Sequence, residues 1–182
     1  MALPANVTTG IWTLDASHSE IGFTVRHAGI SKVRGQFTDA AATLDLAENV
    51  TDSKVNASIK TASFDSGDAN RDGHVRGEDF FDVETFPEIS FASSTIVPKG
   101  DAYELQGDLT IKGITRPVAL ETEFNGVAVD PFGNTRAGLS AETTINRKDF
   151  GLTWNAVLEA GGVLVSDKVA INLELAFIAP AA

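Results

Sequence analysis

Apolar and polar residues alternate along much of this chain, which is the pattern of strands that bury one face. In Glu20–His27 the apolar residues take the odd positions, and Lys168–Phe177 keeps the same phase over its whole length. The pattern predicts about eight or nine strands, and the candidates are Ile11–Asp15, Glu20–His27, Gly35–Leu46, Lys54–Lys60, Glu88–Thr95, Tyr103–Lys112, Val118–Asn125, Leu139–Asn146 and Lys168–Phe177.

The connections between these runs are short, so neighbouring strands are expected to be antiparallel. Asp130–Asn134 is rich in turn residues and predicts a hairpin loop. In Gly35–Leu46 the apolar residues change from odd to even positions, which predicts a β-bulge near Ala40–Ala42.

Helix is scarce in this pattern. Ala28–Lys32 is consistent with a single helical turn. Asp65–Phe81 is the main irregular region; it is polar and predicts a short helix that begins near Ser66 or Asp68, although two glycines weaken it.

Strands that each bury one face form either a two-sheet sandwich or a closed barrel. The candidate strands are long and the chain exceeds the size of a small sandwich, which favours the barrel. We therefore predict an all-β fold: an antiparallel up-and-down β-barrel with about eight strands and one or two short helical turns, in a single domain over residues 1–182. Such a barrel has room for side chains or for one small apolar ligand.

Composition narrows the function classes. The 14 Lys and Arg residues are outnumbered by 25 Asp and Glu, and the net charge of −11 repels nucleic acid and anionic membrane surfaces. The chain has no Cys, so it has no disulfide, thiolate nucleophile or Cys metal ligand. No apolar run is long enough for a membrane span, and the first residues lack the features of a secretory signal, which predicts a cytoplasmic protein without stable membrane insertion.

Candidate chemistry is sparse. His18, His27 and His74 lack the spacing of a metal pair, so no metal site is expected. Asp79 and Asp82 are candidates for acid–base work, but an acidic chain contains such pairs by chance.

Aromatic residues give a stronger signal. Phe80, Phe81 and Phe86 follow the polar region directly. This segment is either a plug or lid with aromatic anchors at a barrel mouth, or a hydrophobic staple that holds a long loop, and the sequence does not separate these two interpretations.

Several short motifs follow one another along most of the chain: Trp12–Asp15, Ser17–Ser19, Ile21–Phe23, Val25–His27, Val33–Phe37, Asp79–Val83, Phe86–Phe91, Gly107–Thr115, Pro117–Val118 and Ile145–Gly151. In this order they resemble the YceI-like family of polyisoprenoid-binding proteins. The resemblance implies an extended, lipocalin-like barrel that holds a long isoprenoid chain in an apolar channel. It also implies frequent homodimers, and many relatives are periplasmic.

Thirteen apolar side chains are the candidates for ligand contact: Phe23, Val25, Phe37, Phe80, Phe81, Phe91, Leu120, Phe124, Leu139, Ile145, Trp154, Ile171 and Leu173. Arg71, Arg76 and Arg147 are candidates for an anionic or carbonyl headgroup, because a guanidinium can donate to two oxygens at once. For Arg147 the alternative is an ion pair in a solvated loop.

The leading hypothesis is non-catalytic binding of a long-chain isoprenoid, of polyprenyl or quinone type, for storage, transport or stress protection, with no cofactor. The first alternative is an enzyme that acts on an amphipathic prenyl-type substrate through His27, His74 and the Asp79/Asp82 pair. The second is a barrel filled by its own side chains that serves as an interaction scaffold.

Overall fold

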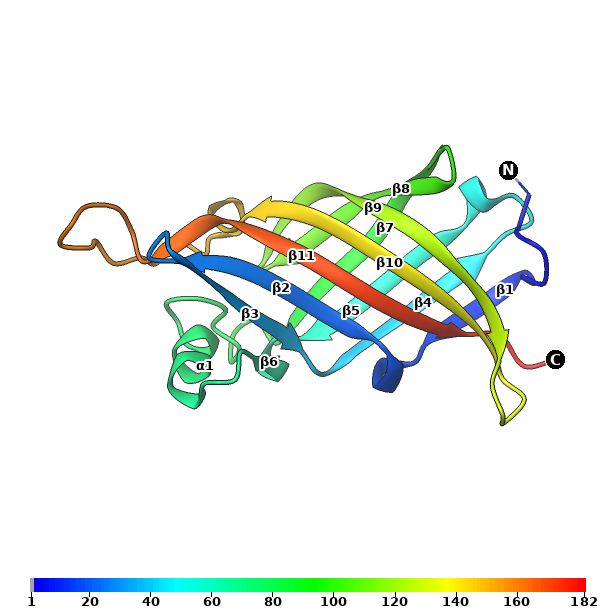
Figure 1. Ribbon diagram of the computed structural model, residues 1–182, viewed down its shortest axis with the longest axis horizontal. Helices are drawn as coiled ribbons and strands as arrows, with labels where there is room; N and C mark the ends of the chain where they lie inside the picture. Colours follow the sequence, from blue (N-terminus) through cyan, green and yellow to red (C-terminus); the bar gives the residue numbers. More distant parts are fainter. Residues whose placement is uncertain (1) are drawn as a thin grey trace.

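Strands make up most of the computed structural model, which describes residues 2–182 (Figure 1). The strands are β1 (Gly10–Leu14), β2 (Glu20–His27), β3 (Ser31–Phe37), β4 (Ala40–Leu46), β5 (Lys54–Lys60), β6 (Phe64–Asp65), β7 (Glu88–Lys99), β8 (Ala102–Ile111), β9 (Ile114–Val129), β10 (Thr135–Asn146) and β11 (Val165–Ile178). The helical segments are α1 (Ala69–Arg76) and the 3-10 turns η1 (Ala16–His18), η2 (Val50–Asp52), η3 (Thr61–Ser63) and η4 (Arg147–Phe150).

The strands close into an antiparallel barrel of eight wall strands. Three wall strands are each made of two segments: β1 with β2, β3 with β4, and β5 with β6. The long strand β11 pairs with β10 on one side and with both β1 and β2 on the other, so the ring of backbone hydrogen bonds is complete. The predicted all-β, up-and-down barrel is confirmed.

The break between β3 and β4 corrects one prediction. Ala40–Ala42 pairs in regular register with the residues of β5, so the predicted bulge is not there. Instead the chain leaves the ladder at Thr38 and Asp39. This two-residue interruption explains the change of phase, because Phe37 before it and Ala40 after it both face the barrel interior.

The predicted helix in the polar region is α1, and its start near Asp68 is confirmed. The Asp68 carboxylate accepts a hydrogen bond from the backbone N–H of Arg71, which caps the helix. Asp72 is buried and accepts from the backbone N–H and the hydroxyl of Ser66, so it ties α1 to β6. No helix within residues 2–182 is long and apolar enough to cross a bilayer.

The connection between β2 and β3 is a tight hairpin turn, so the helical turn predicted for Ala28–Lys32 is wrong. Ala28 and Gly29 both have positive φ angles, 53° and 71°. Such conformations are typical of the hairpin turns whose twist matches that of the flanking strands. The predicted hairpin loop at Asp130–Asn134 joins β9 to β10.

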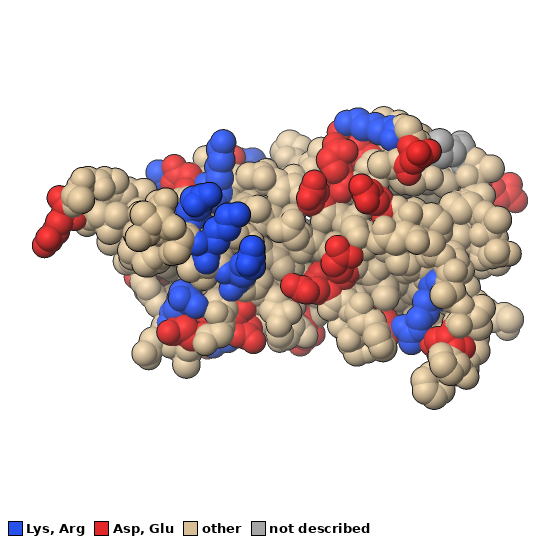
Figure 2. Space-filling view, viewed as in Figure 1, with Lys and Arg blue, Asp and Glu red and all other residues tan. Residues whose placement is uncertain are grey.

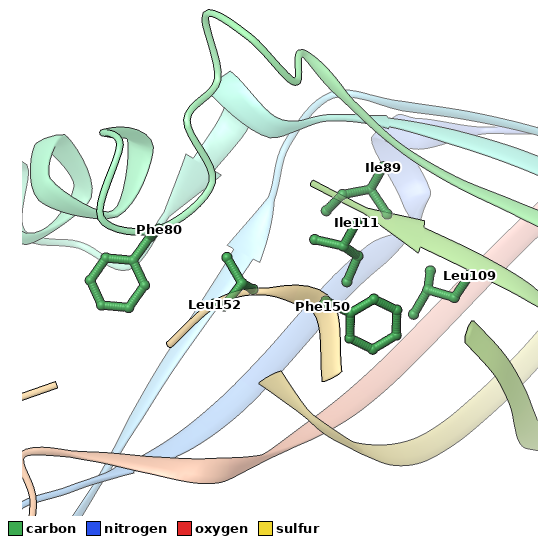
Figure 3. Packing of buried hydrophobic residues seen from close by; sticks show 6 residues of the cluster. All are labelled: Phe80, Ile89, Leu109, Ile111, Phe150 and Leu152. Atoms are coloured by element: carbon green, nitrogen blue, oxygen red, sulfur yellow. The ribbon is translucent and has the colours of Figure 1, made fainter. Parts of the chain in front are cut away.

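Two buried clusters lie toward opposite ends of the barrel. One consists of Phe80, Ile89, Leu109, Ile111, Phe150 and Leu152. In Figure 3 Leu152, from the segment after η4, lies between Phe80 and Phe150, so this cluster fastens both long loops to the barrel. The other contains Trp12, Leu44, Ala137 and Phe177 near the two termini, and Trp12 is fully buried.

An ionic cluster fastens the β1–β2 corner to the β9–β10 hairpin at the end near the termini. Arg136 forms ion pairs with Asp15 and with Asp130, the latter at 2.7 Å from Nε to Oδ2. The Ser17 hydroxyl, then Arg136 and His18, lower the pKa of Asp15. Arg136 and the backbone N–H of Asn134 lower the pKa of Asp130. The charged forms of Asp15 and Asp130 therefore stabilise the folded protein.

This cluster predicts a loss of stability in acid. A folded-state pKa below the unfolded value gives stability that is complete above the unfolded pKa, near 4, and is lost as the pH falls toward the folded pKa. We expect the free energy of unfolding to decrease between about pH 5 and pH 3, and Arg136→Gln to make that decrease shallower. Urea unfolding at several pH values measures this. The control Arg116→Gln removes an exposed guanidinium on β9; equal slopes in wild type and Arg136→Gln would contradict the prediction.

Candidate functional site

The barrel encloses an almost wholly apolar cavity of about 730 Å³. This volume falls within the range of roughly 300–1,000 Å³ that is typical of ligand pockets. An interior of this size does not support the hypothesis of a barrel filled by its own side chains. The cavity is the candidate binding site.

All thirteen apolar residues proposed from the sequence lie on the cavity wall. They are Phe23, Val25, Phe37, Phe80, Phe81, Phe91, Leu120, Phe124, Leu139, Ile145, Trp154, Ile171 and Leu173. Most were found because inward positions alternate along each strand. Their contact with a ligand stays a prediction.

Four phenylalanine rings form a continuous aromatic surface on one part of the wall. The ring of Phe23 stacks on that of Phe64, with centroids 5.1 Å apart, and Phe37 and Phe81 contact Phe64 at 5.7 and 5.9 Å. Sequence reasoning missed Phe64, because the 3-10 turn η3 interrupts the alternation that runs through β5. A polarizable surface of this kind offers dispersion contacts to an apolar chain.

Two inward glycines make room for aromatic rings on the wall. A Cβ atom on Gly107 would lie 2.5 Å from both Phe91 Cζ and the carbonyl oxygen of Ala92. A Cβ on Gly35 would lie 2.3 Å from Phe23 Cζ. Each ring therefore lies close over the backbone of a neighbouring strand, which keeps it out of the centre of the cavity.

The segment after α1 contributes a second group of rings. His74 contacts Phe80 and Trp154 edge-on, at centroid distances of 5.3 and 4.7 Å. Phe80 is buried in the cluster of Figure 3 and also lines the cavity. Phe80 thus anchors the loop as a hydrophobic staple and also forms part of the cavity wall. Features of both earlier interpretations, the staple and the aromatic anchor at the barrel mouth, are therefore present in this segment. Phe86 lies against Gly113 outside the cavity.

Polar residues from β2 and α1 mark the mouth of the cavity. Arg26 and His27 lie at the end of β2, and Ser66, Asn70 and Arg71 lie at the start of the α1 segment. The Nε of Arg71 donates to the Ser66 hydroxyl at 2.7 Å, and Nη2 donates to the Ser66 carbonyl at 2.9 Å. These two hydrogen bonds hold the guanidinium at the mouth and do not use the N–H donors of Nη1.

Arg147 has a different environment from the one proposed for it. It lines the cavity but is buried, and it donates four hydrogen bonds to the carbonyl oxygens of Leu152, Trp154, Val165 and Ser166. Burial lowers its pKa. Because the carbonyls take four of its five N–H donors, Arg147 holds the base of the β10–β11 loop, and this geometry does not favour a headgroup role.

Arg76 is also engaged by the backbone. Its guanidinium donates to the carbonyl oxygens of Ala62 and Phe64, and the residue is not on the cavity wall. Of the three proposed arginines, only Arg71 combines a place at the mouth with unused donors.

The residues of the enzyme hypothesis are brought together only in part. His74 Nε2 lies 2.9 Å from Asp79 Oδ2, and the two side chains are 43% and 55% exposed. His27 lies on β2, and Asp82 lies in the turn after Phe81. Across the part of the chain that the structure describes, no group of three or more His, Asp or Glu side chains is arranged to hold a metal ion.

Comparison with known proteins adds the family. The YceI-like domain matches residues 12–177. UPF0312 protein VPA0850 of Vibrio parahaemolyticus is 38% identical over 156 residues, which cover 84% of this chain and 82% of that protein. The chain belongs to the YceI-like family.

Two solved structures share the fold of this YceI-like chain. Burkholderia cenocepacia BcnA is 25% identical, with a TM-score of 0.78, and the match covers 90% of this chain and 98% of that one. A polyisoprenoid binding domain from Saccharophagus degradans, implicated in plant cell wall breakdown, has a TM-score of 0.69 over 93% of this chain and 98% of that one. At 15% identity, the second match speaks for the fold alone.

Two motifs of the YceI-like resemblance lie in the loops next to the cavity. Asp79–Val83 forms the turn after α1 that supplies two wall phenylalanines, and Ile145–Gly151 contains the end of β10 and η4, where Arg147 lies. Two of the motifs on which the resemblance rests therefore surround the candidate site.

The environments of Arg147 and Arg71 predict stability losses of very different size for the same substitution. We expect Arg147→Gln to lower the free energy of unfolding by about 3 kcal/mol, because several buried carbonyls lose a charged donor. Arg71→Gln should change it by less than about 0.5 kcal/mol, because its side chain is on the surface. Urea unfolding measures both; similar losses would show that Arg147 does not hold the loop.

Proposed function

We propose that this chain is a non-catalytic binding protein for one long-chain isoprenoid lipid, of polyprenyl or isoprenoid-quinone type, which the barrel cavity takes up for storage, transport or stress protection. The observation that carries the proposal is the apolar cavity of about 730 Å³ inside a closed wall. The choice of ligand class extends to this chain what the resemblance to YceI-like polyisoprenoid-binding proteins implies, and the domain from Saccharophagus degradans with the same fold is itself described as polyisoprenoid binding.

Magnitudes show that apolar burial alone suffices for tight binding. A chain of roughly 30–40 carbons gains about 24–32 kcal/mol gross, at about 0.8 kcal/mol for each buried CH₂ group. Non-covalent affinities saturate near about 18–21 kcal/mol, so ordering of the lipid and opening of the mouth offset a large part. Such a ligand is expected to dissociate slowly and to remain bound during purification.

No reaction is part of the proposal. His74 and Asp79 form an acid–base pair, but each is about half exposed. Electrostatic catalysis gains most where water is excluded, and this pair lacks that environment. The absence of catalysis is part of our proposal, and the exposure of this pair supports it.

Native mass spectrometry of freshly purified protein, followed by organic extraction, tests ligand binding directly. We expect one prenyl lipid per chain, and the same spectrum reports whether the chain forms the dimer that the resemblance implies. Ala57 faces the cavity on β5, whereas Ala119 on β9 is exposed. Ala57→Phe places a ring in the lipid's space and should lower occupancy about tenfold, consistent with the cost of overpacking a buried site.

Ala119→Phe is the matched control and should retain full occupancy. Thermal unfolding of both variants shows whether each is folded. A wild-type protein that stays free of ligand after incubation with prenyl alcohols and prenyl pyrophosphates would refute the proposal. Equal occupancy in Ala57→Phe and Ala119→Phe would place the lipid outside the cavity.

The headgroup is proposed to lie beside Arg71. Arg71→Gln should lower the affinity for a prenyl pyrophosphate about tenfold, because a hydrogen bond to a charged group contributes about 1.5–3 kcal/mol. The affinity for the uncharged prenyl alcohol should not change. Competition binding with both ligands measures the contrast, and Arg116→Gln on the outer face is the control. An equal effect on the two ligands would remove Arg71 from the headgroup site.

A further inference from the structure

Positive charge is concentrated on one side of the mouth, although the whole chain carries a net charge of −11. Figure 2 shows Lys and Arg side chains gathered over β2, β3 and the start of β11, while acidic side chains lie over the middle of the barrel. Four exposed residues form this basic patch: Arg26, Lys32, Arg34 and Lys168.

The strand register brings the four side chains of the basic patch together. Arg26 lies directly opposite Lys32 in the β2–β3 ladder, and Arg34 lies two residues further along β3 on the same face. Lys168 precedes Val169, which pairs with Val25 on β2. All four line one shallow hollow on the outer surface of the barrel.

This arrangement costs stability in the isolated protein. Like charges directly opposite each other on antiparallel strands repel. Within residues 2–182 none of the four side chains forms an ion pair, whereas Lys60, Lys99 and Arg136 each do. An anionic surface placed against the patch would relieve this repulsion.

Exposed apolar side chains adjoin the basic patch at the mouth. Ile30, in the turn between β2 and β3, is 86% exposed, and Val157 in the β10–β11 loop is 84% exposed. Val157 pairs with Val163, which is 46% exposed, in a small hairpin that projects beyond the barrel (Figure 1). The Ala28 backbone N–H donates to the Leu164 carbonyl at 2.8 Å, so the turn and the hairpin are joined.

We propose that this side of the mouth docks on the surface of an anionic lipid bilayer. The basic patch would contact lipid phosphates, and Ile30 and Val157 would enter the interface between headgroups and acyl chains. Basic residues beside exposed apolar ones are the combination that binds anionic interfaces. An anionic bilayer offers phosphates to the basic patch and an acyl boundary to the apolar tips, so a single surface fits both features.

The remaining charges define the orientation. Asp68 and Asp79 lie on the α1 side of the mouth, and Glu159 lies at the tip of the loop hairpin. Asp68 and Asp79 restrict the contact to the β2–β3–β11 side, so the barrel would lie tilted on the membrane. Glu159 beside Val157 opposes the contact, and Asp167 on β11 pairs with Lys148 at 3.3 Å. Screening reduces the repulsion from more distant acids, since the Debye length is about 8 Å at physiological salt.

Vesicle flotation tests the docking surface without reference to the bound lipid. The probe is a vesicle of phosphatidylcholine with 30% phosphatidylglycerol. We expect the wild-type protein to bind this vesicle, to bind less as the phosphatidylglycerol fraction is reduced, and to bind less in high salt. Arg34→Gln/Lys168→Gln should weaken this binding about 25-fold, or about fivefold for each basic side chain. Neutral phosphatidylcholine vesicles should bind wild type and variant equally weakly.

Two further variants make the test specific. Lys54→Gln/Arg116→Gln removes the same number of exposed positive charges outside the patch and should bind like wild type. Ile30→Ser/Val157→Ser should weaken binding to anionic vesicles while its salt dependence remains. A wild-type protein that does not float with anionic vesicles, or equal losses in both charge variants, would overturn the proposal and leave an acidic macromolecule as the partner of the patch.

The proposal of membrane docking and the proposal of lipid binding can be refuted separately. The patch variant Arg34→Gln/Lys168→Gln changes no residue of the cavity wall or its mouth, so its prenyl-lipid occupancy in native mass spectrometry should equal that of wild type. Loss of vesicle binding with full occupancy supports docking as a separate property. Vesicle binding by a protein that never takes up a prenyl lipid would leave docking in place and refute only the proposed function.

Discussion

Completion of the backbone hydrogen-bond ring around β11 is the constraint on which the rest of this molecule depends. β11 is long enough to pair with β1 near its end and with β2 along most of its length, so the wall closes on itself at this strand. A closed ring forces every second side chain of each strand to point inward. The interior is then apolar because the sequence alternates, and it is hollow because eight strands enclose more space than these side chains occupy.

The three interrupted wall strands are a second consequence of closure. Each break, at η1, at Thr38–Asp39 and at η3, lets the chain change direction while the apolar residues on both sides still face inward. Aromatic rings then cover bare backbone at Gly35 and Gly107, which leaves the centre of the barrel open. The strand breaks and the two glycines thus both help to keep the interior apolar and open.

The period-two pattern was enough to predict the barrel and most of the apolar wall residues, because inward and outward positions alternate by geometry alone. Phe80, Phe81 and Trp154 lie outside the strands and were proposed on other grounds. The pattern was not enough where the chain changes direction: Phe64 was missed, and the bulge near Ala40–Ala42 and the helical turn at Ala28–Lys32 were wrong. The sequence also could not show which arginine binds the backbone and which is available at the mouth. Arg71 and Arg147 look alike in sequence, and only the fold shows that Leu152, Trp154, Val165 and Ser166 turn their carbonyls toward Arg147.

The two ends of the cavity differ. Trp12 is fully buried near the termini, and Leu3, Pro4 and Val7 lie along the wall at that end, while the polar rim with Arg71 lies at the other. Under the proposed function, a lipid whose headgroup lies beside Arg71 would enter with its apolar tail first and leave with its headgroup first. An acceptor of such a lipid would then meet the polar headgroup before the hydrocarbon, and release would begin with an exchange of headgroup contacts.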